Sequence, residues 1–194
     1  MGRKNGVMAR SRPSRARPPL DSRQLEELAL RYVGRYATSR AKLAGYLARK
    51  VRERGWGDGR EPDFDALADR FSDLGYVDDA AYALAKSQAL TSRGYGKRRI
   101  EQRLRAAQIG EEDGNAAREH ANSHAVEAAL RFAERRRIGP FGAAEGDPKK
   151  REKAIGAMIR AGHSFALARA IVDWPADFPV EKNEIAERAG LTLS

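Results

Sequence analysis

Apolar residues recur along this chain at the spacing of one helix face. The first such segment has the pattern i, i+3, i+4, i+7, i+8, which is typical of an amphipathic helix, at Leu25, Leu28, Ala29, Tyr32 and Val33. Comparable stripes occupy residues 40–51 and 64–74, with glycines and Pro62 between them. Because no segment alternates apolar and polar residues as a strand would, the pattern predicts an all-α protein.

A two-part pattern occurs three times: an apolar helix start is followed by a basic cluster and then by aliphatic residues at i, i+4. The aliphatic anchors Leu43, Ile100 and Ile155 are 57 and 55 residues apart. Self-similarity at a fixed period is typical of repeat proteins, whose units pack on their neighbours. We therefore expect an elongated array of three tandem three-helix repeats. The expected segments are repeats at 25–79, 80–125 and 126–174, followed by a C-terminal tail at 175–194 with at most one short helix around 181–189.

A stop-and-restart signal lies near the middle of the chain. Gly75 suits the left-handed position that ends a helix. Asp78 or Asp79 suits the N-cap of the next helix, where a carboxylate accepts free backbone N–H groups. The alternative for this acidic pair is a metal site, but no further ligand cluster accompanies it, so we interpret it as a cap.

Composition favours small helical units over one large core. Of 194 residues, 41% are hydrophobic and 33% are charged. The absence of cysteine excludes disulfides and thiolate metal sites. No apolar run reaches 18 residues, so we expect no membrane segment and a cytoplasmic location.

The net charge of +10 comes from 37 basic and 27 acidic residues. Residues 1–24 carry seven basic side chains against one acid and few apolar residues, so we expect them to form a disordered basic arm. A basic excess favours a polyanionic partner, of which nucleic acid is the commonest. The alternative is that the charge serves solubility alone.

Basic residues recur at the same position of each repeat. In the second repeat, Gly94 and Gly96 free the backbone just before a helix, so its N–H groups could face a phosphate. The spacing is not that of a Walker loop, and the alternative is a flexible turn with a solvated basic face. The candidate nucleic-acid contacts are Arg40, Lys42, Tyr95, Lys97, Arg98, Arg99, Lys150, Arg151 and Lys153.

Other chemistry finds little support. His120 and His124 share a helix face, but no third strong ligand lies nearby, so we expect no metal site. His163 is interpreted as a turn residue. No nucleophile motif is present, so we expect neither an enzyme nor a cofactor. Most aromatic residues lie on apolar helix faces and are assigned to the core, with Tyr95 as the exception.

Residues 74–83 read Leu-Gly-Tyr-Val-Asp-Asp-Ala-Ala-Tyr-Ala. This segment resembles the signature L-G-[YF]-[LIV]-D-D-x-x-[YF]-A of the RecX family of bacterial recombination regulators. Residues 94–109 resemble its second repeat, residues 29–47 its first and residues 162–170 its third, so the resemblance covers about 25–174. The chain departs from the family at Lys42, where members often carry an acid, and at 107–108, where they usually carry a basic residue and a glycine.

This resemblance implies a curved array of three three-helix repeats. It implies binding within the groove of the RecA nucleoprotein filament, with contacts to RecA and to single- and double-stranded DNA. The activity would be modulation, usually inhibition, of RecA strand exchange, ATP hydrolysis and coprotease function, and we expect a monomer. Two alternatives stay open: a sequence-independent nucleoid DNA-binding protein, and a helical-repeat scaffold for an acidic protein.

Overall fold

The computed structural model describes residues 18–142, 147–175 and 178–192. In these ranges the protein is all-helical, as predicted, and the single β feature is an isolated bridge between Leu20 and Trp56. The helices are α1 (Ser22–Val33), α2 (Arg40–Arg54), α3 (Phe64–Asp73), α4 (Asp79–Ser92), α5 (Lys97–Ala106), α6 (Asn115–Ser123), α7 (Ala125–Arg136), the 3-10 helix η1 (Gly139–Phe141), α8 (Pro148–Arg160), α9 (Phe165–Val172) and α10 (Lys182–Arg188).

Local capping residues fix many of the helix starts. The side chain of Ser39 accepts a hydrogen bond from the N–H of Lys42, and Ser164 accepts one from Leu167. Asp78 caps α4 by accepting the N–H of Ala81 at 2.8 Å, as an N-cap carboxylate does. Gly75, with φ of 75°, follows the end of α3 in the left-handed conformation that was predicted.

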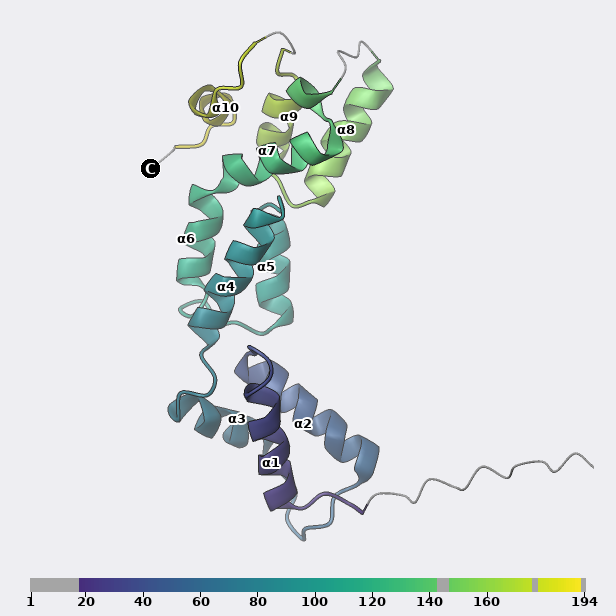
Figure 1. Cartoon of the computed structure of the whole chain (residues 1–194), viewed down its shortest axis with the longest axis vertical. Helices are drawn as coiled ribbons and strands as arrows, with labels where there is room; N and C mark the ends of the chain where they lie inside the picture. The colour runs from purple at the N-terminus through teal and green to yellow at the C-terminus, as the bar shows by residue number, and fades with distance from the viewer. Residues whose placement is uncertain (1–17, 143–146, 176–177, 193–194) are drawn as a thin grey trace, which may run out of the picture.

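The apolar residues form three separate clusters along the chain. Helices α1–α3 enclose the first, α4–α6 the second and α7–α10 the third. Tyr95 packs against both the second and third clusters, whereas the first and second share no residue among those described. The molecule is therefore elongated, and Figure 1 shows the groups stacked along a curved long axis.

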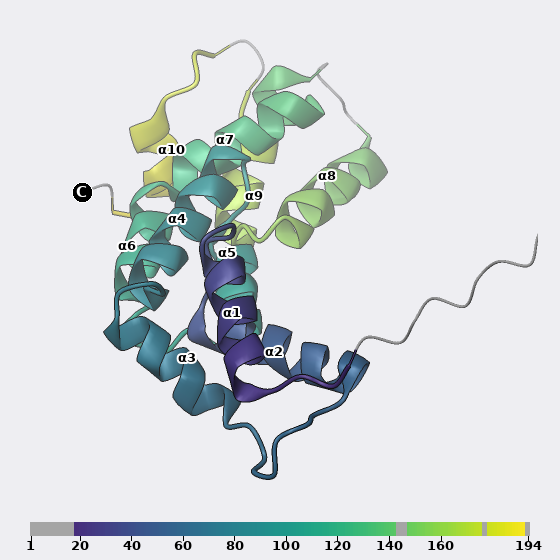
Figure 2. The ribbon, with the colours of Figure 1, turned by 60° about the horizontal axis from the view of Figure 1, so that its bottom comes forward.

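Three helices lie on the concave side of this curve. Figure 1 shows α2, α5 and α8 to the right of the long axis, with α6 on the opposite margin. In Figure 2, turned by 60°, α2 and α8 remain on the right while α3 and α6 remain on the left. These three helices each contain one of the predicted aliphatic anchors Leu43, Ile100 and Ile155.

The expected basic arm ends earlier than residue 24. Leu20 is fully buried, its N–H donates to the carbonyl of Gly55 at 2.9 Å, and its own carbonyl accepts the N–H of Gly57 at 2.8 Å. Asp21 then caps α1. The prediction that residues 18–24 are disordered is therefore wrong. The burial of Leu20 and the helix cap at Asp21 hold this segment against the first helical group. Residues 1–17 lie outside the described residues.

The segment after residue 174 is more than a tail. Ile185 and Ala186 of α10 are buried in the third cluster, together with Trp174. The guanidinium of Arg188 lies 4.6 Å from the centre of the Trp174 ring. Helix α10 confirms the short helix expected around 181–189, but its packing into the third cluster lies beyond the repeat boundary expected at residue 174.

Candidate nucleic-acid interface

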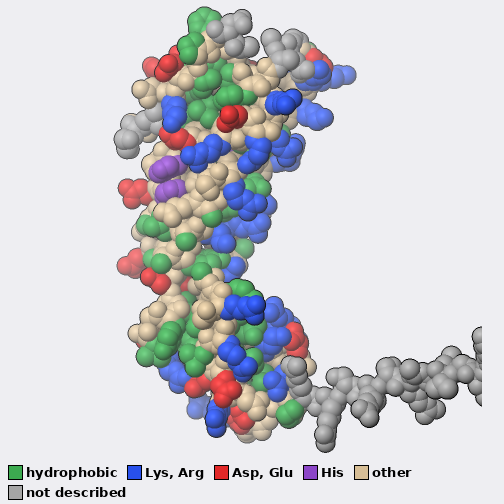
Figure 3. All heavy atoms as spheres, viewed as in Figure 1, with side chains coloured by type: hydrophobic (Ala, Val, Ile, Leu, Met, Phe, Trp, Pro, Cys, Tyr) green, Lys and Arg blue, Asp and Glu red, His purple; other side chains and the backbone are tan. Residues whose placement is uncertain are grey.

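Positive charge is concentrated on the three helices of the concave side. Helix α2 carries six cations and one acid, while α5 and α8 each carry five cations and one acid. No other helix in the described ranges has an excess of more than one cation. Figure 3 shows Lys and Arg side chains gathered along this side, with several Asp and Glu on the opposite margin. We call the Lys and Arg side chains of α2, α5 and α8 the cationic face.

The start of α5 abuts the end of α8 through backbone hydrogen bonds. The N–H of Gly96 donates to the carbonyl of Ala161 at 3.0 Å, and the N–H of Arg98 donates to the carbonyl of Gly162 at 3.1 Å. The N–H groups of Gly96 and Arg98 are therefore not available to a phosphate, which argues against the first of the two interpretations of this glycine turn. The sequence around Gly96 indicates a helix start with free N–H groups. The carbonyls that accept from these groups belong to residues about 65 positions further along the chain, so no local pattern could reveal them.

Glycine is required at this contact because the two backbones touch. A Cβ atom on Gly96 would lie 2.4 Å from the carbonyl oxygen of Gly162. A Cβ on Gly162, where φ is 100°, would lie 2.5 Å from the nitrogen of Arg99. The two turns therefore approach more closely than any side chain would allow.

The side chains at the start of α5 remain directed to solvent. Lys97 and Arg98 are exposed, and Arg99 is half-buried with its Nη1 donating to Oε1 of Gln102 at 2.8 Å. Tyr95 is half-buried between the second and third clusters, and the Arg93 guanidinium lies 5.8 Å from its ring centre. The sequence reasoning missed two further exposed cations on α5, Arg103 and Arg105, which follow the glycine turn by more than one helical turn.

Arg40 is held by carboxylates from three other elements. Its Nε lies 3.2 Å from Asp79 Oδ2, its Nη2 lies 3.2 Å from Asp113 Oδ2, and its Nη1 lies 3.6 Å from Asp69 Oδ1. The hydrogen bond to Asp79 is the main reason that the pKa of Arg40 is raised. We call these contacts the Arg40 joint, and they connect α2 to α3, to α4 and to the loop before α6.

Two neighbours of Arg40 also cross from the first cluster to the second. The hydroxyl of Ser39 donates to the carbonyl of Ala107 at 2.9 Å. Lys42 lies with its Nζ 5.3 Å from the centre of the Tyr82 ring, a cation–π distance. The basic residues expected at the start of α2 therefore serve the connection between helical groups in this structure.

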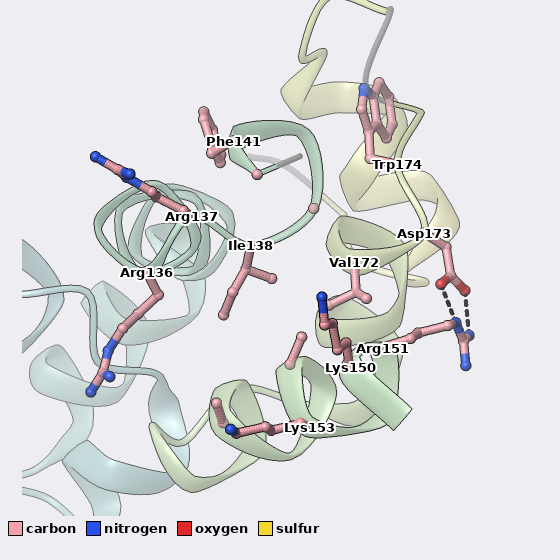
Figure 4. Close-up of a pocket in the computed structure, with 14 residues that line it drawn as sticks. Arg136, Arg137, Ile138, Phe141, Lys150, Arg151, Lys153, Val172, Asp173 and Trp174 are labelled. Carbon is pink, nitrogen blue, oxygen red and sulfur yellow. Dashed lines mark hydrogen bonds and ion pairs between the residues drawn. The ribbon is translucent and has the colours of Figure 1, made fainter. Parts of the chain in front are cut away.

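A cleft lies between the end of α7, η1, α8 and α9 (Figure 4). Its charged lining consists of five cations and one acid: Arg136, Arg137, Lys150, Arg151, Lys153 and Asp173. Figure 4 shows Ile138 and Val172 toward the centre of the cleft and the end of Arg137 directed away from it. The cleft brings the predicted residues Lys150, Arg151 and Lys153 together with Arg136, the last residue of α7, and Arg137, its C-cap, which the sequence reasoning did not select.

Arg151 is held by an acid at α9's C-terminal end. Its Nε and Nη2 each donate to an oxygen of Asp173 at 2.6 Å (Figure 4), the bidentate geometry that arginine and carboxylate favour. This pair raises the pKa of Arg151 and lowers that of Asp173. Asp173 thus neutralises part of the cationic face at α8.

The described residues give no sign of a metal centre. Among them, no group of three or more His, Cys, Asp or Glu side chains is placed to hold an ion. His120 and His124 stack on each other with ring centres 4.2 Å apart, and His120 Nδ1 lies 3.3 Å from the Ser87 hydroxyl. Within the same ranges, no helix combines the length and the apolar character needed to cross a bilayer.

The fold and the charge pattern define an extended helical protein with a cationic concave side. No family model matches the chain. It is 31% identical over 160 residues to the regulatory protein RecX of Myxococcus xanthus, covering 77% of this chain and 84% of that one. It is 30% identical over 150 residues to the regulatory protein RecX of Thermobifida fusca, covering 75% of each. The chain belongs to the RecX family of regulatory proteins, as its motifs predicted.

Proposed function

We propose that this protein binds the RecA–DNA filament in the cytoplasm and modulates RecA, chiefly by inhibition. The activities affected are strand exchange, ATP hydrolysis and coprotease function, and through them DNA repair, recombination and the SOS response. Membership of the RecX family supports RecA as the partner. The observation that carries the proposal is the concentration of cations on α2, α5 and α8, along one side of an elongated body.

An elongated cationic side suits a long polyanionic groove for an electrostatic reason. Each cation near a phosphate displaces condensed counterions, so several cations in a row give affinity without a sequence requirement. A single deep pocket would not be expected to follow a filament over such a length. The protein is proposed to act as a monomer without a cofactor.

The array of three tandem three-helix repeats is part of this proposal. Helices α1–α3 and α4–α6 surround the first two apolar clusters, α7–α9 surround the third together with α10, and the second helix of each set of three is the basic one. Such a repeat would present one binding chemistry three times along the filament.

The proposed contacts fall into two groups. Side chains that face solvent at α5 and α8 contact DNA or RecA directly, and Arg40, Lys42 and Arg151 hold the surface in shape through their intramolecular partners. Tyr95 is proposed to support the contact surface from beneath. The direct contacts are Lys97, Arg98, Arg99, Arg103, Arg105, Lys150 and Lys153.

The test is RecA-catalysed, single-strand-dependent ATP hydrolysis and strand exchange with this protein titrated in. The variant is Lys97→Ala/Arg98→Ala/Arg99→Ala. The control is Arg23→Ala/Arg70→Ala/Arg131→Ala, which removes the same charge from helices outside the cationic face. We expect inhibition by the wild type and the control at well below one copy per RecA monomer, and much weaker inhibition by the α5 variant.

The two other functions predict different results. A sequence-independent nucleoid protein would bind naked DNA and filament equally, with a steep salt dependence, and would leave RecA activity unchanged. A scaffold for an acidic protein would bind no DNA at moderate salt. Either result would overturn the proposal.

A further inference from the structure

A hollow at the surface of the first helical group combines tyrosines with arginines. It lies between the end of α1 and the middle of α2, and its volume is about 510 Å³. This volume is within the range of roughly 300–1,000 Å³ typical of small-ligand sites. The hollow is lined by Leu28, Arg31, Tyr32, Arg35, Tyr36, Tyr46 and Arg49.

The tyrosines form a short stack that ends at solvent. Tyr32 and Tyr46 are stacked with ring centres 4.1 Å apart and planes at 16°. Tyr36 is tilted against Tyr32 at 5.3 Å, and 52% of Tyr36 is exposed. Tyr32 and Tyr46 therefore join α1 to α2, whereas Tyr36 presents an aromatic surface that packing within the chain does not use.

Cations surround this stack. The Arg35 guanidinium lies 5.8 Å from the centre of the Tyr36 ring, and Arg49 and Lys50 lie 5.5 Å and 5.8 Å from the centre of the Tyr46 ring. Arg49 and Lys50 share the carboxylate of Glu53. Arg31 pairs with Glu27, whereas Arg35 makes no ion pair with any described acid. Positive charge therefore exceeds negative charge around the hollow.

We propose that this hollow is a base-stacking site for single-stranded nucleic acid. One base packs on the exposed ring of Tyr36, and Arg35 and Arg31 contact the adjoining phosphates. Aromatic rings flanked by cations suit such a strand because every base has a π-face and every linkage carries a charge. A duplex does not fit, since its bases are already stacked on one another. The inference deepens the proposed function, on which it rests, by naming a DNA contact of the first helical group.

The chain contains a matched control for exposed tyrosine. Tyr76 is 55% exposed and tilted against Phe71, much as Tyr36 is tilted against Tyr32. In the described part of the chain no cation lies over the Tyr76 ring. Comparing the two positions separates the proposed site from the general effect of removing a surface aromatic.

The test is fluorescence anisotropy of the full-length protein with a labelled oligothymidylate and with an abasic oligomer of equal length. Tyr36→Ala should weaken oligothymidylate binding by roughly 5- to 100-fold, the usual effect of losing one stacked base. Tyr36→Trp should retain or strengthen binding, and Tyr76→Ala should match the wild type. Binding of the abasic oligomer should be the same for all four proteins.

Three results would overturn the site: Tyr36→Ala binding like Tyr76→Ala, an equal loss on the abasic oligomer, or Tyr36-dependent binding of a polyglutamate peptide. The last result would assign the hollow to an acidic polypeptide. This assay contains no RecA, so a negative result would reject the Tyr36 site without affecting the proposed regulation of RecA. Conversely, if the protein did not inhibit RecA, a Tyr36 effect on oligothymidylate binding would still identify a single-strand site.

Discussion

The carboxylate of Asp79 caps a helix to which it does not belong. Its Oδ1 accepts the backbone N–H of Arg40, the first residue of α2, at 2.8 Å, while its Oδ2 accepts from the Arg40 Nε at 3.2 Å. Asp78, one residue earlier, caps α4 in the ordinary way. The two adjacent acids of the sequence signature therefore start two different helices, one on each side of the Arg40 joint.

Asp79→Ala should lower the free energy of unfolding by about 1–3 kcal/mol, because the part-buried N–H and the guanidinium of Arg40 both lose an acceptor. The measurement is urea denaturation followed by circular dichroism. Asp73→Ala, at an exposed acid of α3, should leave the midpoint almost unchanged. Equal midpoints for the two variants would contradict the role assigned to Asp79.

Arg40→Ala and Lys97→Ala should have opposite profiles. Arg40 has three carboxylate partners, so its loss should reduce stability more than DNA affinity. Lys97 is exposed at the start of α5, so its loss should leave stability unchanged and reduce the salt dependence of DNA binding by about one phosphate contact. Denaturation and salt-titrated DNA binding of both variants would distinguish these profiles. Identical profiles would contradict the separation of structural residues such as Arg40 from contact residues such as Lys97.

Gly96→Ala should destabilise the protein by about 1–3 kcal/mol, since its Cβ would overlap the backbone of Gly162. Gly45→Ala is the control, because Gly45 lies within α2 and no atom lies within 4 Å of a Cβ built there. That substitution should stabilise by about 0.5–1 kcal/mol through helix propensity. Thermal unfolding measures both, and a stable Gly96→Ala protein would show that the α5–α8 contact can separate.

The helices and their caps were predictable because their signals are local. The spacing of apolar residues and the capping side chains Ser39, Asp78 and Ser164 act within a few residues of the helix that they start. The sequence signal for helix α10 was weaker, because only two of its side chains are buried. Its stability depends on packing against α7 and α9.

The roles of the basic residues were not predictable, because they depend on distant partners. In the sequence, Arg40 cannot be told from an exposed cation, because its partners Asp79 and Asp113 lie 39 and 73 residues away along the chain. The start of α5 looks like an anion site until the end of α8 occupies its N–H groups. The sequence thus located the cationic helices but could not separate their contact residues from their structural ones.

Asp173→Asn should strengthen DNA binding. The substitution removes the carboxylate that neutralises Arg151, so one more cation of the cleft becomes available to phosphate. We expect affinity to rise and the salt dependence to steepen by up to about one phosphate contact. Asp73→Asn changes the net charge equally at a distant acid and should have a smaller effect. Equal effects would mean that only the net charge of the protein matters.

His163 is buried at the contact between the second and third helical groups. Its Nε2–H donates to the carbonyl of Gly94 at 3.1 Å, and its ring is tilted against Phe132. Its Nδ1 has no hydrogen-bond partner among the described residues. Burial lowers the pKa of His163 to about 4, although the bond to Gly94 acts in the opposite direction.

This lowered pKa should make the contact sensitive to acid. Between pH 6.5 and about 4 the unfolded chain binds a proton at His163 that the folded protein does not, so stability falls as pH falls. From pH 7 to pH 5, above the range in which most carboxyl groups titrate, the loss should approach about 2 kcal/mol. His163→Gln can still donate to Gly94 but cannot titrate, so its loss over this interval should be smaller by that amount. Urea denaturation of both proteins at the two pH values measures the difference, and parallel losses would show that His163 is protonated in the folded protein at pH 5.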